Sequence, residues 1–422
     1  TVAILAQGKH FRPKLRSLRG ATARRALGRA VHSTMPEGQE ETTVVLFYRY
    51  ENLGDERAAA LAEEQRRLGA ELGLSGRVLV ASEGINGTVQ GGAEAVAAYE
   101  SAVEAVFPDG IDWKRSPGGS AALFPDFAVK EVAELVGFSI RGGEPLDVRR
   151  EAGTRLSPVE FDQLLGETPA EDLRVIDVRN SFEYEVGHFD GAVDPRMHHA
   201  AQWPRFVEKN LEDMRGRKVL LYCTGGIRCE KASAYLCRRL RETAVDGPPP
   251  LVHQLEGGIH RYLEAFPDGG RFRGANFVFD KRAQMRPEAA GGLTVGRCSE
   301  CSEPWDTHHG GRLCCVCRAL VLVCDACDAA SEHGEYYCGE HAELRGVYYH
   351  FVDRFGAEEL QEQAAELRRR LAAEVGNKRK NRRATLRKKA EQLEARLGQL
   401  RASGAAGEGA PAGRPPRGRA HA

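Results

Sequence analysis

The pattern of hydrophobic and polar positions predicts a small α/β domain over residues 42–150. Apolar residues at intervals of three to four mark helices, and short apolar runs mark strands. In chain order these elements are a strand at 43–48, a helix at 58–72, strands at 77–81 and 87–90, a helix at 93–107 and a strand at 111–115.

The order of these elements, β-α-β-β-α-β, predicts a ferredoxin-like fold for the first domain. A second α/β domain is predicted over residues 154–272, where Ser157-Pro158 provides an N-cap and a proline at the first helical position. Helical segments then alternate with predicted strands at 173–179, 218–222 and 252–255, the first of which ends in charged residues. We therefore predict a parallel sheet with helices on both faces, with functional side chains at the carboxyl ends of the strands.

Composition suits two or three domains with sizeable cores, because the 422 residues are 42% hydrophobic and carry no formal net charge. No apolar run approaches the roughly 18 residues of a membrane-spanning helix, so no membrane partner is predicted. Charge is uneven, since the first 36 residues hold eight Lys or Arg and no Asp or Glu. This basic arm, residues 1–41, has the composition of an organelle transit peptide. The alternative is a disordered basic tail that carries no targeting signal.

A second basic run lies within residues 356–422, which we predict to be a basic helix followed from Ala402 by a disordered tail. Residues 368–389 hold eleven Lys or Arg and one Glu, a density that can neutralise several phosphates. The run contains no aromatic side chain, so it is predicted to position RNA and not to read bases. The alternatives are a solvated charged helix and a nuclear-import-like run.

Eight of the eleven cysteines lie between Cys298 and Cys338, in the CxxC spacing of thiolate pairs that grip tetrahedral zinc. This usage favours a reducing, intracellular compartment. We predict a zinc-binding module over residues 296–345 with two closed, structural sites, in which metal supplies much of the folding energy. The predicted ligands are Cys298, Cys301, Cys315, Cys317, Cys324, Cys327, Cys338 and His341. Cys314, His308 and His309 remain competing ligands, and an iron–sulfur cluster or reactive cysteines are the alternatives.

Cys223 is the strongest candidate nucleophile, because it stands between an apolar run and a helical run. Backbone N–H groups of the following glycine turn, the positive end of the helix and Arg228 all favour a thiolate. The alternative is a buried cysteine beside an ordinary turn. Cys229 is placed either to resolve an oxidised or persulfidated Cys223 through a disulfide or to pack beneath the loop, and Cys237 is predicted to be core.

The loop from Cys223 to Arg228 resembles the six-residue active-site loop of rhodanese-type sulfurtransferases, which hold a persulfide on cysteine. The longer string 222–233 (YCTGGIRCEKAS) resembles that of rhodanese-containing tRNA uridine hydroxylases, which install 5-hydroxyuridine at the wobble position. Segments that agree are 82–87 (SEGING), 180–188 (NSFEYEVGH), 255–259 (LEGGI) and 276–280 (NFVFD). The resemblance covers residues 42–341 and implies a rhodanese-like catalytic domain over residues 154–272.

The resemblance also implies roles for individual residues. The expected catalytic residues are Cys223, Arg228 and Cys229. The expected substrate-binding residues are Thr224, Gly225, Gly226, Ile227 and Lys130. Asp177 is expected to stabilise the fold or the loop, and Glu183 and His188 to form a structural corner.

The leading hypothesis is an enzyme that hydroxylates C5 of the wobble uridine of tRNA with dioxygen as co-substrate. The chain contains neither a dinucleotide-binding fingerprint nor the spacing of a 2-His-1-carboxylate iron site. No flavin or nicotinamide site is therefore predicted, and a sulfur species on Cys223 becomes the candidate participant. The alternatives are a thiosulfate-type sulfurtransferase acting through a Cys223 persulfide, and a non-enzymatic RNA- or protein-binding adaptor. A transit peptide would direct the chain to a mitochondrion or plastid; otherwise it is expected in the cytoplasm.

Overall fold

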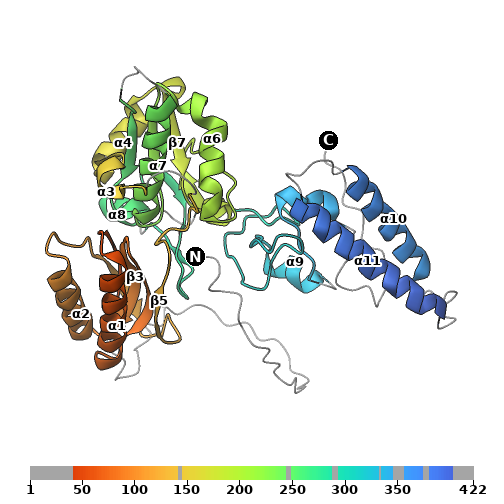
Figure 1. Ribbon diagram of the computed structural model, residues 1–422, viewed down its shortest axis with the longest axis horizontal. Coiled ribbons are helices and arrows are strands. Elements are labelled where there is room, and N and C mark those ends of the chain that lie inside the picture. Colours follow the sequence, from red (N-terminus) through yellow and green to blue (C-terminus); the bar gives the residue numbers. More distant parts are fainter. Residues whose placement is uncertain are drawn as a thin grey trace, which may run out of the picture. The chain divides into compact units, whose positions relative to one another are not determined.

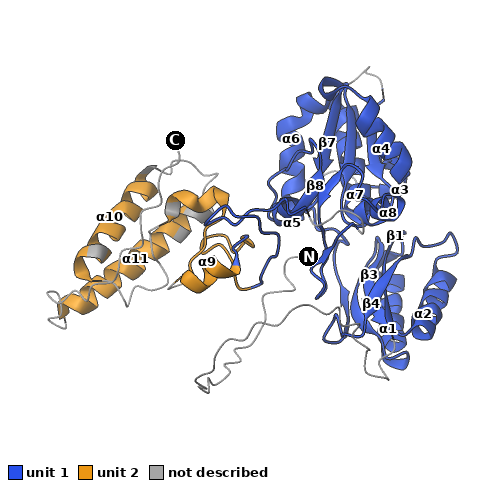
Figure 2. Cartoon of the chain, turned by 180° about the vertical axis from the view of Figure 1, so that it is seen from behind, with its two compact units in different colours: residues 1–310, 322–324 blue, residues 311–321, 325–422 orange. Residues whose placement is uncertain are grey.

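A computed structural model describes residues 41–140, 145–243, 249–287, 293–331, 334–345, 356–373 and 380–402. Residues 1–40 of the predicted basic arm, and the predicted tail after Ala402, lie outside the described residues. The chain divides into two compact units, coloured separately in Figure 2: residues 1–310 with 322–324, and residues 311–321 with 325–422. Within the described part of the chain, no helix combines the length and apolarity needed to cross a membrane.

The N-terminal domain is a five-stranded sheet with two helices on one face (Figure 1). Its elements are β1 (Thr42–Tyr50), α1 (Gly54–Glu71), β2 (Ser75–Ala81), β3 (Gly84–Gly91), α2 (Ala93–Val106), β4 (Lys114–Gly119) and β5 (Phe127–Glu131). The strand order is β4-β1-β3-β2-β5, with antiparallel pairing throughout except that β5 runs parallel to β2. The predicted ferredoxin-like fold is confirmed, with β5 added at one edge.

Apolar side chains of the sheet and of α1 and α2 form the core of this domain, with Val45 and Phe47 of β1 fully buried. The strand predicted at 111–115 begins instead at Lys114, where pairing with β1 starts. The preceding Trp113 packs into the core, with its ring 4.7 Å from the ring of Phe47. Core packing therefore displaces the start of the last predicted strand.

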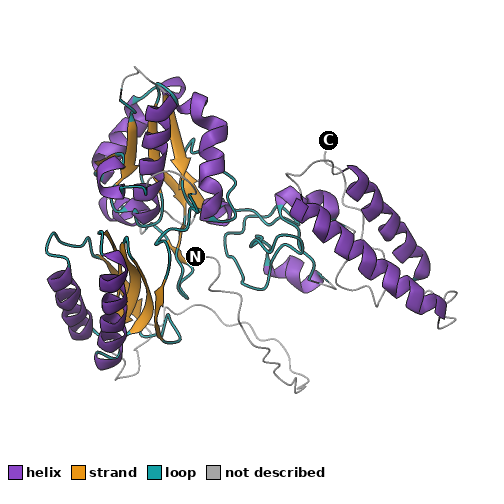
Figure 3. Ribbon diagram, in the orientation of Figure 1, coloured by secondary structure: helices purple, strands orange, loops and turns teal. Residues whose placement is uncertain are grey.

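The second domain contains a four-stranded parallel sheet of order β6-β10-β9-β7. Its elements are α3 (Val148–Glu151), β6 (Thr154–Leu156), α4 (Pro158–Glu167), β7 (Leu173–Asp177), α5 (Ser181–Val186), β8 (Gly187–Phe189), α6 (Trp203–Met214), β9 (Lys218–Tyr222), α7 (Ile227–Thr243), β10 (Val252–Leu255), α8 (Gly258–Ala265) and β11 (Phe272–Gly274). One apolar cluster packs α6 and α7 against the sheet, and another packs α4 and α8 against its opposite face (Figure 3). This confirms the predicted parallel sheet covered by helices on both faces.

The rest of the described chain contains β12 (Asn276–Phe277), β13 (Gln284–Met285), α9 (Asp325–Ala330), α10 (Ala357–Ala373) and α11 (Lys380–Ala402). The Cys-rich segment has few regular elements, which is typical of small folds held by metal ligands. Helices α10 and α11 lie side by side (Figure 1) and bury an apolar seam. The seam consists of Leu360, Ala364, Leu367, Leu386, Ala390, Leu393 and Leu397.

Candidate active site and metal-binding clusters

Cys223 lies directly after β9, at the carboxyl end of the parallel sheet, and α7 begins four residues later. The thiol is fully buried, and its Sγ atom accepts a hydrogen bond from the backbone N–H of Gly226 at 3.2 Å. Gly226 has a φ of 101°, a left-handed conformation that favours glycine. The first turn of α8 supports this loop, because the backbone N–H of Ile259 donates to the Cys223 carbonyl at 2.9 Å. The loop therefore presents a fixed backbone donor to the sulfur.

The surroundings of Cys223 favour its ionised form. Burial alone raises the pKa of the thiol. Several neighbouring groups outweigh burial and lower the pKa to about 6. These are a hydrogen bond from the Cys229 thiol, the charge of Arg228, and the backbone N–H groups of Cys229 and Gly226. Burial, and next the hydrogen bond with Cys223, raise the pKa of Cys229 well above its ordinary value. Cys229 is therefore the protonated partner, and Cys223 is a thiolate at neutral pH.

Arg228 forms a buried ion pair next to Cys223. Its guanidinium donates to both carboxylate oxygens of Glu183, at 2.6 and 2.8 Å, and to Thr224 Oγ1 at 2.8 Å. Glu183 is fully buried and also accepts from the backbone N–H of Asn180 at 3.0 Å, in the capping box of α5. Glu183 thus compensates the charge of Arg228 and fixes it at the loop. Sequence reasoning treated Glu183 as a corner residue and did not connect it to Arg228.

The other predicted site residues lie in separate places. Residues 224–227 form the loop itself, and the Thr224 carbonyl accepts from the backbone N–H of His260 at 3.1 Å. Lys130 is exposed on β5, at the edge of the N-terminal sheet opposite β4. Asp177 pairs with the fully buried Arg179 at 2.6 Å. His188 stacks on the ring of Tyr184, with centroids 4.0 Å apart.

The N-terminal domain contributes side chains to this site that sequence reasoning missed. A Cβ atom at Gly225 would lie 2.7 Å from Leu46 Cδ2. A Cβ atom at Gly226 would lie 2.8 Å from Tyr48 Oη, so both β1 side chains contact the loop. Tyr48 Oη also donates to Glu230 Oε1 on α7 at 3.1 Å. Contacts between two domains follow no local sequence pattern, so no motif pointed to these residues.

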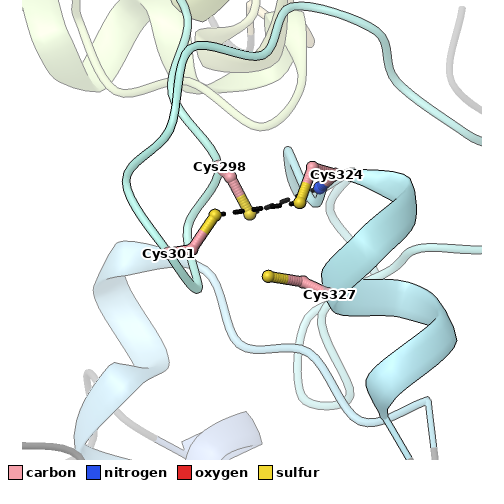
Figure 4. A group of neighbouring side chains, drawn as sticks. All are labelled: Cys298, Cys301, Cys324 and Cys327. Atoms are coloured by element: carbon pink, nitrogen blue, oxygen red, sulfur yellow. Dashed lines mark hydrogen bonds between the residues drawn. The ribbon is translucent and has the colours of Figure 1, made fainter.

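Four cysteines form one cluster of metal-ligand type (Figure 4). The Sγ atoms of Cys298, Cys301, Cys324 and Cys327 all lie within 4.8 Å of one another. The Sγ atoms of Cys301 and Cys324 are 3.7 Å apart. Two thiolates bound to one tetrahedral zinc at about 2.3 Å lie about 3.8 Å apart, so the cluster fits an ion of that size.

A second cluster contains Cys314, Cys317, Cys338 and His341, again with all ligand atoms within 4.8 Å of one another. Cys317 Sγ lies 3.7 Å from Cys338 Sγ, and His341 Nδ1 lies 3.2 Å from Cys338 Sγ. Cys314 therefore takes the place that the sequence analysis gave to Cys315. The physical reason is a tight turn, in which the backbone N–H of Arg318 donates to the Cys314 carbonyl at 2.9 Å. This turn brings the first and last residues of the Cys314-x2-Cys317 pair to one side.

The two competing histidines pack elsewhere. His308 Nε2 lies 2.8 Å from the Phe182 carbonyl oxygen, and its ring meets the Phe182 ring edge to face. Burial lowers the pKa of His308 to about 4, which keeps the ring neutral. His309 stacks on Trp305, with ring centroids 6.4 Å apart. Neither histidine belongs to the two clusters formed by the described residues.

A buried thiolate that follows a parallel strand, in a six-residue loop closed by arginine, defines a rhodanese-type domain. The rhodanese-like domain family matches residues 157–265. The family described as UPF0176 acylphosphatase like domain matches residues 42–135, and the family described as rhodanase C-terminal matches residues 273–341.

Relatives of similar architecture identify the family. The tRNA uridine(34) hydroxylase of Corynebacterium kroppenstedtii is 36% identical over 308 residues, which cover 70% of this chain and 96% of that protein. The protein of the same name from Synechocystis sp. is 37% identical over 297 residues, which cover 66% and 97%. The rhodanese-like domain-containing protein 6 of Arabidopsis thaliana is 34% identical over 310 residues, which cover 69% of this chain and 51% of that protein, about half its length. The chain belongs to the tRNA uridine(34) hydroxylase family.

Proposed function

We propose that the protein hydroxylates C5 of the wobble uridine of tRNA to give 5-hydroxyuridine, with dioxygen as co-substrate and Cys223 as the reactive group. The main support for this proposal is a buried thiolate held by backbone N–H groups of the loop, in a chain whose relatives are named tRNA uridine(34) hydroxylases. Insertion of one oxygen atom into the C5–H bond, with the other released as water, consumes two electrons and two protons. The Cys223 thiolate and the Cys229 thiol supply two electrons and one proton when they become a disulfide, and the second proton comes from water. An external thiol then reduces the disulfide.

The loop residues have distinct roles in this proposal. Arg228 and Thr224, held together by Glu183, keep the loop rigid around the sulfur. The backbone N–H groups of residues 225–227 are proposed to bind the anionic group that Cys223 carries, and that of Gly226 donates to the sulfur at 3.2 Å. Lys130, exposed on β5, is proposed to contact an RNA phosphate.

A nucleoside assay tests the proposal. The protein is incubated with tRNA in air and, in parallel, without oxygen, and the digested tRNA is analysed for 5-hydroxyuridine by mass spectrometry. Oxygen-dependent product supports the proposal. Absence of product, together with rapid sulfur transfer from thiosulfate to cyanide, would instead make the protein a sulfurtransferase that acts through a Cys223 persulfide, because the same loop suits that chemistry.

We also propose that each Cys-rich cluster holds one structural zinc ion. Each cluster offers four soft or imidazole donors, which is the ligand set of closed structural zinc sites. Zinc bound there would supply folding energy to a segment with few regular elements. The metal would take no part in the reaction at Cys223.

Replacing Cys314 with serine is expected to lower the zinc content from about two ions per chain to about one, because the second cluster loses one of its four donors. Replacing the adjacent Cys315 with serine is the matched control and should leave the zinc content unchanged. Elemental analysis of the purified variants by mass spectrometry measures the effect. Equal zinc loss in the two variants would contradict the role of Cys314.

Helix α11 supports tRNA as the partner. Residues 378–389 hold eight Lys or Arg and no acidic residue, and Arg387 and Lys388 are exposed on α11. On α10, by contrast, Arg368 pairs with Glu394 at 2.5 Å and Arg369 pairs with Glu366 at 2.7 Å. The positive charge of α11 is therefore the better candidate for phosphate contacts.

Replacing Arg387 and Lys388 together with glutamine is expected to weaken tRNA binding several-fold and to reduce its salt dependence by about two phosphate contacts. The control replaces Arg368 and Arg369, which removes the same charge from α10, where glutamates already compensate it. Fluorescence anisotropy with labelled tRNA over a range of salt concentrations gives, for each double variant, the slope of the logarithm of affinity against the logarithm of salt concentration. Identical slopes for the two double variants would refute a specific role for α11.

The compartment stays a prediction. The thiolate of Cys223 and the cysteine clusters require reducing surroundings, so we propose an intracellular location. This is a mitochondrion or plastid if residues 1–41 act as a transit peptide, and the cytoplasm otherwise. Imaging of these residues fused to a fluorescent protein distinguishes the two.

A further inference from the structure

Lys114 of the N-terminal domain is a fully buried lysine beside the active-site loop. It is the first residue of β4 and pairs in register with Leu46 of β1. A Cβ atom at Gly225 would lie 4.0 Å from Lys114 Cδ, and one at Gly257 would lie 3.3 Å from Lys114 Cε. The side chain therefore reaches both loops at the carboxyl end of the parallel sheet. Removing an ammonium from water is unfavourable unless other groups stabilise it.

Asp112 and the Tyr48 ring of β1 hold this ammonium in place. Asp112 Oδ2 lies 2.7 Å from Lys114 Nζ, and the Asp112 carbonyl accepts from Nζ at 3.3 Å. The Tyr48 ring lies within cation–π range, with its centroid 5.1 Å from Nζ. Asp112 is held in turn by Arg261 of α8 at 2.6 Å. The position of the charge is therefore fixed relative to the loop.

We propose that Lys114 is a positioning residue of the active site, whose ammonium is the fixed cation with which the N-terminal domain stabilises anionic sulfur on Cys223. Arg228 is one cation beside the sulfur, but the fully buried Glu183 pairs with it at 2.6 Å, so a second fixed cation adds to the stabilisation. The side chain of Asp112 is 43% exposed, whereas that of Lys114 is 0% exposed. Water therefore screens the carboxylate more than the ammonium. The inference rests on the role proposed for Cys223.

The other charged or titratable groups around Cys223 and Lys114 include Asp177 at the end of β7, Arg228, Cys229 and Glu230 on α7, Tyr48 and Tyr50 on β1, and His260 and Glu264 on α8. Burial raises the pKa of both tyrosines well above its ordinary value, so both are neutral. Burial lowers the pKa of His260 to about 4, so it is neutral as well. Glu230 pairs with Arg155 at 2.7 Å. Burial lowers the pKa of Lys114; the charge and hydrogen bond of Asp112 are the main opposing effects, and the charge of Cys223 acts in the same direction as Asp112.

The test is the pH dependence of Cys223 alkylation by iodoacetamide in the whole 422-residue chain, followed by mass spectrometry of the Cys223 peptide. Lys114→Met preserves side-chain length and removes the charge. It is expected to raise the apparent pKa of Cys223 by about one pH unit, which slows alkylation near pH 6 roughly fivefold and leaves the rate at high pH unchanged. Arg115→Met is the matched control, because Arg115 is the next residue of β4 and pairs with Glu100 of α2 at 2.5 Å.

Lys114→Arg keeps the positive charge. The midpoint, meaning the pH at which the alkylation rate reaches half its maximum, should therefore stay near that of the parent protein. If circular dichroism shows that Lys114→Met is unfolded, Lys114→Gln replaces it, because glutamine can still donate to Asp112. An unchanged midpoint in a folded, uncharged Lys114 variant overturns the inference, whatever the nucleoside assay shows. A shifted midpoint in a protein that forms no 5-hydroxyuridine supports the inference and refutes the proposed function.

Discussion

Replacing Cys223 with serine is expected to lower 5-hydroxyuridine formation by about a hundredfold or more. Cys223 is a thiolate at neutral pH, with a pKa of about 6 because hydrogen bonds and the charge of Arg228 outweigh burial. A serine hydroxyl does not ionise at that pH and carries neither a persulfide nor a sulfenate. The measurement is mass spectrometry of nucleosides from tRNA that was incubated in air with the parent or the Cys223→Ser protein.

The matched control for this experiment is Cys237→Ser. Cys237 is a buried cysteine on the same helix, but burial raises the pKa of its thiol to about 11, so it is not a thiolate. Its replacement is expected to leave product formation unchanged. Undiminished product from a folded Cys223→Ser protein would remove the thiol from the mechanism and leave the buried loop without a catalytic role.

Replacing Glu183 with glutamine is expected to lower the free energy of unfolding by about 3–5 kcal/mol. The change keeps the side-chain volume but leaves the guanidinium of Arg228 buried without its counter-charge. Four hydrogen bonds end on the carboxylate, from Arg228, Thr224 and the backbone N–H of Asn180. Urea unfolding followed by circular dichroism measures the loss.

Glu71→Gln on α1 is the control for Glu183→Gln. Its partner Arg67 and Glu71 itself are 53% and 55% exposed, and removal of such a solvent-screened surface pair is expected to leave stability almost unchanged. A loss of similar size in the two variants would contradict the importance of the buried pair at the loop.

The stability effect of Glu183→Gln should depend on pH. Burial raises the pKa of Glu183. The charge of Arg228 and its hydrogen bonds have the opposite and larger effect, so the pKa lies below its ordinary value of 4.5. A carboxyl group with a depressed pKa in the folded state stabilises the protein above its ordinary pKa. That contribution is lost as the pH falls through the folded-state pKa. The stability difference between the parent and the variant should therefore be full at neutral pH and shrink in acid below pH 4.5.

Short-range patterns were sufficient for most of the fold. Strands β9 and β10 begin and end at the predicted residues, and their side chains are mostly buried. Helix α4 begins where Ser157 accepts from the backbone N–H of Glu160, as the N-cap residue predicts. Strand β4 of the N-terminal sheet is different. Its start at Lys114 coincides with the packing of Trp113 into the core, which local periodicity does not reveal.

The ligands of the second cysteine cluster could not all be chosen from sequence spacing. Cys314, Cys315 and Cys317 all lie near enough in the chain to be ligands. The backbone turn closed by Arg318 decides which thiols reach Cys338, and it brings Cys314 into the cluster. A CxxC spacing predicts such a turn, yet the neighbouring Cys315 left the choice open until the backbone was known.

The sequence by itself determined the two α/β domains, the thiol loop of Cys223 and the cysteine pairs, because these depend on periodicity and spacing over a few residues. Only the tertiary structure decided what surrounds the thiol. Glu183 reaches Arg228 across 45 residues of chain, and Lys114 reaches the loop from another domain. Burial and charge compensation between distant residues arise from the packing of whole elements, and such contacts follow no periodic pattern along the chain.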